Sequence, residues 1–228
     1  MKWMLVGLCA ALTLGAQESK RREEDVKRIH ESATVLDEIM NARDRGLPED
    51  LLQKARCVGI VPNLKRAGFV LGGQYGKGVL TCRLAEEPGW SAVSTIRVEG
   101  GSIGFQIGAG ETDLVFIVMN ESGMNRLMHD KFTVGGDASV MAGPVGRTAD
   151  AETDAEMKAE ILAYSRAHGV FAGVALDGAT LRPDNDDNEA EYGRAVTQEQ
   201  ILHGHVHPRP SMTALYQELN RWAPFKKV

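Results

Sequence analysis

Three histidines near the C-terminus have the spacing in this chain that comes closest to a metal site. His203, His205 and His207 alternate in the sequence H-G-H-V-H. On an extended strand they would share one face at intervals of roughly 6–7 Å, where they could hold zinc or copper. The sequence offers no partner that would orient the imidazole rings, and Pro208 and Pro210 follow directly. We therefore predict exposed histidines before a proline-rich turn, and no metal or other cofactor.

A glycine-rich loop of the kind that cradles phosphate groups stands at Gly72–Gly78. A P-loop needs G-x-x-x-x-G-K followed by Ser or Thr, whose hydroxyl reaches the magnesium ion, but here Gly78 follows Lys77. A dinucleotide-binding loop should also open a long helix, whereas Val79–Leu84 has the composition of a strand. No G-x-S-x-G nucleophile elbow occurs either. The residues select no reaction, and we predict that the protein is not an enzyme.

The acidic stretch Asp184–Tyr192 begins like a calcium-binding loop. Counted from Asp184, its first, third and fifth residues match the first three ligand positions of an EF-hand. The sixth position should be glycine and is Glu189, and the twelfth should be glutamate and is Ala195. Because the turn residue and the bidentate ligand are both missing, we predict a solvated acidic loop.

Length and composition fit one large soluble domain. The chain has 228 residues, of which 43% are hydrophobic and 25% charged, which is long enough to bury a core without staples. The formal net charge is −5. An acidic protein has no broad attraction for nucleic acid or for an anionic membrane, so any such contact needs a local basic patch. We predict no nucleic-acid partner.

The first sixteen residues have the features of a secretory signal peptide. Lys2 supplies a minimal positive region, and the apolar run Trp3–Leu14 is too short to span a bilayer comfortably. Small residues close the segment at Ala16. We predict a signal peptide over residues 1–16, a single mature domain over residues 17–228, and a periplasmic or secreted protein. The alternatives are an uncleaved N-terminal anchor and a buried helix.

Two cysteines lie outside that segment. In an oxidising compartment, Cys57 and Cys82 could form a disulfide across neighbouring strands. The alternative is a pair of buried thiols that behave as small hydrophobic residues. Their spacing fits no zinc motif, and the sequence leaves the two possibilities open.

Apolar periodicity places helices toward the ends of the chain. In Lys20–Asn41, apolar residues recur every three or four positions, which predicts an amphipathic helix packed on the core. The alternative is a helix that also meets a membrane surface. Shorter helices are predicted at Glu49–Ala55, Gly123–Asp130, Thr197–Leu202 and Met212–Trp222.

Between these helices the chain has the pattern of strands joined by short turns. We expect Cys57–Pro62 to be a strand ended by its proline and Asn63–Arg66 to be a turn. Gly68–Leu80 should be a strand, a tight glycine bend and a second strand, since interior glycines disfavour a helix. Thr112–Met119 should be a strand buried on both faces. The predicted fold class is α+β: a largely antiparallel, glycine-rich sheet or partly closed barrel with flanking N- and C-terminal helices.

Long segments of the chain, in order and spacing from about residue 30 to 205, resemble the SYLF domain family. Members of this family are best known as eukaryotic lipid-binding and actin-patch proteins and also occur as exported bacterial proteins. The segments that carry the resemblance are C-V-G-I-V-P-N-L-K-R-A-G-F-V-L-G-G-Q-Y-G-K-G-V-L, W-S-A-V-S-T-I, G-G-S-I-G-F-Q-I-G-A-G-E-T-D-L-V-F-I-V-M-N, K-F-T-V-G-G-D-A-S-V-M-A-G-P-V-G-R and Y-S-R-A-H-G-V-F-A-G-V-A-L-D-G-A.

The resemblance implies binding of phosphoinositides or other anionic phospholipids at a membrane surface. By position, one basic group on the N-terminal helix and a second on the glycine-rich segment would supply the charge, at about 1 kcal/mol for each exposed residue. Because we predict export, we expect a bacterial anionic phospholipid and do not expect actin binding. The candidate lipid-binding residues are Lys20, Arg21, Arg22, Lys27, Arg28, Lys65, Arg66 and Lys77.

Two other functions compete with lipid binding. A structural protein of the cell envelope would use the helices and the sheet to bind protein partners. A metal-dependent enzyme would be centred on the three histidines. Neither is favoured by a motif in the sequence.

Overall fold

The computed structural model describes residues 2–42, 45–68, 71–85, 87–103, 108–128, 132–133, 140–146, 159–167, 169–174, 176 and 178–225. For residues 2–16 it describes the course of the helix and not the side chains.

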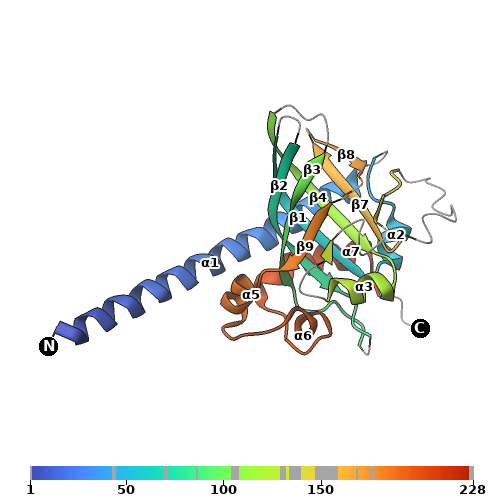
Figure 1. Ribbon diagram of the computed structural model, residues 1–228. Helices are drawn as coiled ribbons and strands as arrows, with labels where there is room; N and C mark the ends of the chain where they lie inside the picture. Colours follow the sequence, from blue (N-terminus) through green and yellow to red (C-terminus); the bar gives the residue numbers. More distant parts are fainter. Residues whose placement is uncertain are drawn as a thin grey trace.

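One curled, mostly antiparallel sheet forms the centre of the described chain (Figure 1). Its strands lie in the order β5-β9-β3-β2-β1-β4-β7-β6, and β8 pairs with β7. Only the β6–β7 pair is parallel among the described ladders. This confirms the predicted α+β class with an antiparallel sheet. The strands are β1 Cys57–Gly68, β2 Leu71–Cys82, β3 Ser94–Ile103, β4 Gly108–Val118, β5 Phe132–Thr133, β6 Val140–Ala142, β7 Ile161–Ala167, β8 Val170–Gly173 and β9 Ala179–Pro183.

Strand β1 is longer than the sequence suggests, and the predicted stop at Pro62 and turn at Asn63–Arg66 are wrong. The pairing of β1 with both neighbours shifts by one residue just after Val61. A proline is tolerated at such a bulge because its missing N–H would not be needed for the ladder. Asn63 takes up the extra residue with a φ of 53°, and its backbone N–H donates to Asp113 Oδ1 at 3.0 Å. The strand therefore continues through the predicted turn.

The predicted glycine bend inside Gly68–Leu80 is also wrong in its position. Strand β2 runs without a break from Leu71 to Cys82, and residues 69–70, between β1 and β2, lie outside the described residues. Glycines inside β2 serve close packing instead. A Cβ added at Gly78 would lie 2.3 Å from the carbonyl oxygen of Ile60, so only glycine fits there.

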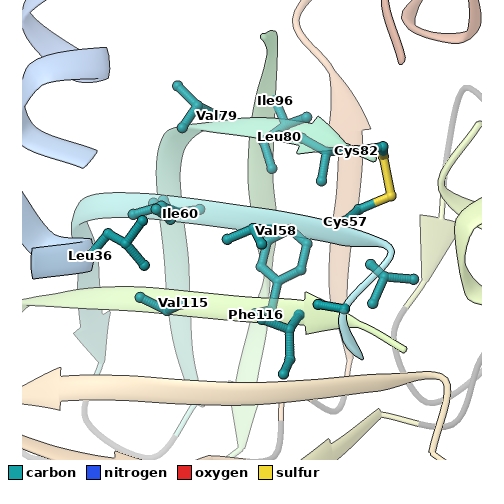
Figure 2. Close-up of a cluster of buried hydrophobic side chains, with 14 of the residues drawn as sticks. Leu36, Cys57, Val58, Ile60, Val79, Leu80, Cys82, Ile96, Val115 and Phe116 are labelled. Atoms are coloured by element: carbon teal, nitrogen blue, oxygen red, sulfur yellow. A yellow bond between two sulfur atoms is a disulfide. The ribbon is translucent and has the colours of Figure 1, made fainter. Parts of the chain in front are cut away.

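The sheet is buried on both faces over most of its length. On one face, Leu36 of helix α1 packs toward Ile60 of β1 (Figure 2). On the opposite face, a Cβ at Gly59 would meet the ring of Phe116, which is fully buried. We call the first the helix face and the second the inner face. The run Leu114–Val118 of β4 is buried throughout, as predicted for a strand covered on both sides.

Helices cover the helix face and close the lower end of the sheet in Figure 1. The apolar stripe of the N-terminal helix, including Ile29, Leu36 and Ile39, is buried as the periodicity predicts. The capping box at Thr197, whose hydroxyl accepts from the N–H of Gln200, starts α6 close to the predicted residue. The helices are α1 Lys2–Asn41, α2 Glu49–Lys54, α3 Glu121–Leu127, α5 Asn185–Tyr192, α6 Gln198–Leu202, the 3₁₀ turn η1 Pro210–Met212 and α7 Thr213–Trp222.

The acidic stretch predicted as a solvated loop is the helix α5, so that prediction is wrong. Gly193, in the left-handed region with a φ of 67°, ends the helix at its C-cap. Three of its polar residues are buried, namely Asp187, Asn188 and Glu191. The Asn188 side chain accepts a hydrogen bond from the backbone N–H of Thr95 at 2.7 Å and so binds α5 to β3. Hydropathy alone predicts that such polar residues are exposed, and it cannot indicate that they are buried with hydrogen-bonding partners.

Cys57 and Cys82 form a disulfide, which resolves the alternative left open by the sequence. They are directly opposite each other at the ends of β1 and β2, and the bond is visible in Figure 2. It therefore links the two strands at the end of the ladder opposite the Gly68–Gly72 pair.

Two predictions at the ends and in the middle of the chain are not decided by the fold. Helix α1 begins at Lys2 rather than Lys20 and runs unbroken through the predicted signal peptide. No helix among the described residues has a stretch both long and apolar enough to cross a membrane. The acidic stretch at residues 148–160, which the sequence leaves as either a loop or the start of an exposed helix, lies mainly outside the described residues.

Candidate lipid-binding surface

Several of the predicted lipid-binding cations form ion pairs with carboxylates of α5 or with Asp184, the residue that precedes it. The Arg21 guanidinium lies 3.0 Å from the Asp186 carboxylate. Lys77 Nζ lies 2.7 Å from Asp184 and 2.6 Å from Asp187. Burial by itself lowers the pKa of Lys77, but these hydrogen bonds raise it overall. These cations bind α1 and β2 to α5 and are already neutralised by acidic neighbours.

Arg28 joins the same network from the first half of α1. It contacts the carboxylate of Asp25 and lies 3.4 Å from Asp187 Oδ2. Asp25 is only 1% exposed. Burial raises the pKa of Asp25 to about 7, although the Arg28 cation opposes this effect and the Asp187 carboxylate adds to it. Arg28 therefore fixes the helix to the domain.

The remaining predicted cations of α1 are exposed. Lys20 and Lys27 each pair with a glutamate one helical turn on, at 3.9 Å from Glu24 and 3.6 Å from Glu31. Arg22 is half exposed and lies 4.0 Å from the buried Glu191. Exposed pairs of this kind are weak, so these side chains remain free to exchange partners at a charged surface.

Lys65 and Arg66 are adjacent in β1 and differ from the other six. Neither is bonded to an acidic group among the described residues. Lys65 is exposed on the helix face, opposite Tyr75 of β2. Arg66 is half-buried and points to the inner face, the side shared by Leu64. The predicted second patch is thus divided between the two faces, and Lys77 is not part of a free patch.

The neighbours of Arg66 on the inner face are polar or lack a side chain. Gln74 lies directly across β2 from Arg66, and Gly110 directly across β4. Thr112 is two residues along β4 from Gly110 and therefore on the same face. The Nε of Arg66 and the hydroxyl of Thr112 are both buried without a hydrogen-bond partner. Burial lowers the pKa of the Arg66 guanidinium.

Sequence reasoning missed three residues at this end of the sheet. Tyr75, 47% exposed, is one of the few large exposed hydrophobic residues among those described. Gln74 and Thr112 lie beside Arg66 on the inner face. The two-residue alternation of β2 and β4 could have placed these side chains relative to each other. The bulge at Asn63, which decides the face of Arg66, could not be read from the sequence.

The three histidines line a groove and do not form a cluster of metal-ligand geometry. His203, His205 and His207 are exposed, and no three potential ligands lie together anywhere in the described part of the chain. They line a groove of about 680 Å³ together with Arg83 and Trp90. The Arg83 guanidinium lies 4.5 Å from the ring centroid of Trp90 and makes a cation–π contact with it.

Comparison with known proteins places the chain in a family. Residues 99–222 match the family described as Ysc84, Las17-binding protein actin regulator. LAS seventeen-binding protein 3 of Saccharomyces cerevisiae is 36% identical over 77% of this chain and 39% of its own length. The SH3 domain-containing YSC84-like protein 1 of Homo sapiens is 31% identical over 79% of this chain and 52% of its own length.

The chain spans between about two fifths and one half of the length of these relatives. The family match at residues 99–222 spans the end of β3 and the described elements from β4 to α7. It overlaps the later segments that carry the resemblance in the sequence. The chain belongs to the Ysc84 family of SYLF domains.

Proposed function

We propose that this protein binds anionic phospholipid at a membrane surface, without covalent chemistry, as an exported protein. Family membership supports a binding role rather than catalysis. The apolar run at Trp3–Leu14 supports export, and so does the disulfide, because such bonds persist in oxidising compartments.

The lipid proposal rests mainly on Lys65 and Arg66, because these two cations form no ion pair with a described residue. Most cations of the network around α5 have a carboxylate within 4 Å and would have to break that contact to meet a phosphate. Lys65 and Arg66 have no carboxylate within 4 Å among the described residues. Glu111 is the residue opposite Lys65 on β4, but the two side chains form no ion pair. The exposed ring of Tyr75 beside Lys65 adds an amphipathic side chain of the type found at membrane interfaces. This end of the sheet therefore offers charge and apolar contact together.

Charge reversals at two places test where the membrane docks. Co-sedimentation with phosphatidylglycerol vesicles would compare the Lys65→Glu/Arg66→Glu pair with the Lys20→Glu/Lys27→Glu pair on α1. Both pairs change the net charge equally. We expect the β1 pair to lose most of the binding and the α1 pair a smaller part. Equal losses would mean that only net charge matters, and binding that is the same at about 50 mM and about 500 mM salt would contradict electrostatic docking.

A second candidate function is protein binding in the groove beside Arg83 and Trp90. Its histidines and its stacked arginine would suit an extended acidic or aromatic segment. A chain with no vesicle affinity that forms a stable, Arg83-dependent complex with an envelope protein would favour this function over lipid binding.

A further inference from the structure

We propose that the inner face of the sheet at β1, β2 and β4 holds one phosphate group, with Arg66, Gln74 and Thr112 as its donors. The inference rests on the proposed function in one respect, since it takes the phosphate to be that of a phospholipid headgroup. It adds a defined site to what would otherwise be a diffuse attraction between charges.

The strand register brings the three side chains together. Arg66 and Gln74 are directly opposed across β1 and β2, a position in which Cβ atoms lie about 5 Å apart. On β4, Gly110 is opposite Arg66 and Thr112 is opposite Leu64. Thr112 is therefore the diagonal neighbour of Arg66, about 7–8 Å away and within reach of a long side chain. All three belong to the inner face.

Each of the three has unused hydrogen-bonding capacity. The Arg66 Nε and the Thr112 hydroxyl are buried without partners. Gln74 is 7% exposed, and no described residue bonds to its amide. Buried polar groups in folded proteins are nearly always paired. The two buried groups without partners, Arg66 Nε and the Thr112 hydroxyl, lie beside the unbonded amide of Gln74 and indicate a missing partner.

The donor set selects the chemistry of that partner. A guanidinium, a carboxamide NH₂ and a hydroxyl can all donate, and the guanidinium fork matches two phosphate oxygens. No described residue beside Arg66 on the inner face is acidic, because its neighbours are Gln74, Gly110, Leu64 and Thr112. One unpaired positive charge is balanced by one phosphodiester, which carries a single negative charge.

Open space beside Arg66 could admit the phosphate. A Cβ added at Gly110 would meet no atom within 4 Å, and Gly110 has an ordinary strand conformation. A side chain there would therefore occupy the space next to Arg66 without displacing the protein. Gly73 is equally open but belongs to the helix face, because it alternates with Gln74 along β2. Substitution at Gly73 is therefore a matched control for substitution at Gly110.

The first test compares adjacent cations on opposite faces. Binding of the full chain to phosphatidylglycerol vesicles would be titrated at about 150 mM salt for wild type, Arg66→Gln and Lys65→Gln. Loss of a charged hydrogen-bonding partner predicts an affinity at least about tenfold lower for Arg66→Gln. Lys65→Gln should lower it about two- to threefold. Thermal unfolding checks that Arg66→Gln folds, which we expect because the change removes an unpaired buried charge.

The second test blocks the site without changing any charge. Gly110→Val should lower the affinity as Arg66→Gln does, whereas Gly73→Val should leave it within about twofold, since valine suits a strand at both positions. Equal effects of Arg66→Gln and Lys65→Gln, together with no effect of Gly110→Val, would overturn the inference. They would leave the proposed function standing as docking by net charge.

Competition experiments with inorganic phosphate and glycerol phosphate distinguish a site for free phosphate from a site for the phosphate of a lipid headgroup. Competition of either with vesicles, lost in Arg66→Gln, would support a site that also accepts free phosphate. Arg66-dependent vesicle binding without competition would support a site that needs the lipid. If wild type binds no vesicles, the proposed function fails. Arg66-dependent stabilisation by free phosphate would then keep the site, and its absence would overturn the site as well.

Discussion

A single backbone position, Asn63, decides which cations face which side of the sheet. Its left-handed conformation inserts one extra residue into β1. Without this bulge the alternation of β1 would place Arg66 on the helix face and Lys65 on the inner face. Asparagine adopts positive φ more readily than most residues other than glycine.

Substitution at Asn63 tests the bulge. Asn63→Gly should change the free energy of unfolding little, because glycine adopts the same conformation. Asn63→Val should lower it by about 1–3 kcal/mol, since a β-branched residue is strained at positive φ. Urea unfolding of both variants measures the difference. Equal stability of the two would show that the left-handed bulge does not persist in solution.

Asp25 predicts a pH dependence of stability. Its folded pKa of about 7 lies above the usual value near 4. Its protonated form is thus favoured by folding, and this contribution is complete below about pH 4 and is lost as the pH rises through about 7. Relative to Asp25→Asn, wild type should lose on the order of 3 kcal/mol between pH 4 and 8. Chemical unfolding across that range checks this.

The control for Asp25→Asn is Asp50→Asn, an exposed residue in the first turn of α2. Its pH profile should run parallel to that of wild type. If Asp25→Asn also followed wild type at every pH, Asp25 would not be the group that titrates.

The junction between helices α1 and α5 depends on buried charges. Asp187→Ala would leave Arg28 and Lys77 without a shared buried carboxylate, which should cost about 3 kcal/mol. Asp186→Ala removes an exposed carboxylate of the same helix, paired with Arg21, and should cost less than about 1 kcal/mol. Denaturant midpoints would compare them. A similar loss for both variants would contradict the structural role given to the buried network.

Most elements were predictable, because periodicity and capping are local. The stripe of α1, the buried run of β4 and the cap of α6 each follow from residues close in sequence. Helix α5 was not predictable. Its polar residues Asp187 and Asn188 are buried against Lys77 of β2 and Thr95 of β3, and these hydrogen-bonding partners are distant in the sequence.

The candidate site was predictable only where it depends on residues close together in the sequence. Lys65 and Arg66 could be found as a basic pair, but their separation onto two faces depends on the bulge. Gln74 and Thr112 carry no motif. They join Arg66 only through the pairing of three strands.

The Cys57–Cys82 disulfide joins the two central strands of the sheet, β1 and β2. The two cysteines are 25 residues apart, and closing a loop of that size stabilises the fold by about 3 kcal/mol in the chain-entropy account. The double variant Cys57→Ser/Cys82→Ser should therefore unfold at a lower denaturant concentration than the oxidised wild type. Reduced wild type should resemble the variant. An unchanged midpoint in both would contradict this contribution.

Co-sedimentation of the full chain with two kinds of vesicle at about 150 mM salt tests whether the chain recognises anionic phospholipid. We predict that the protein pellets with phosphatidylglycerol vesicles and stays in the supernatant with phosphatidylcholine vesicles, because only the first offer unbalanced phosphate charge. Equal pelleting with both, or with neither, would contradict the claim.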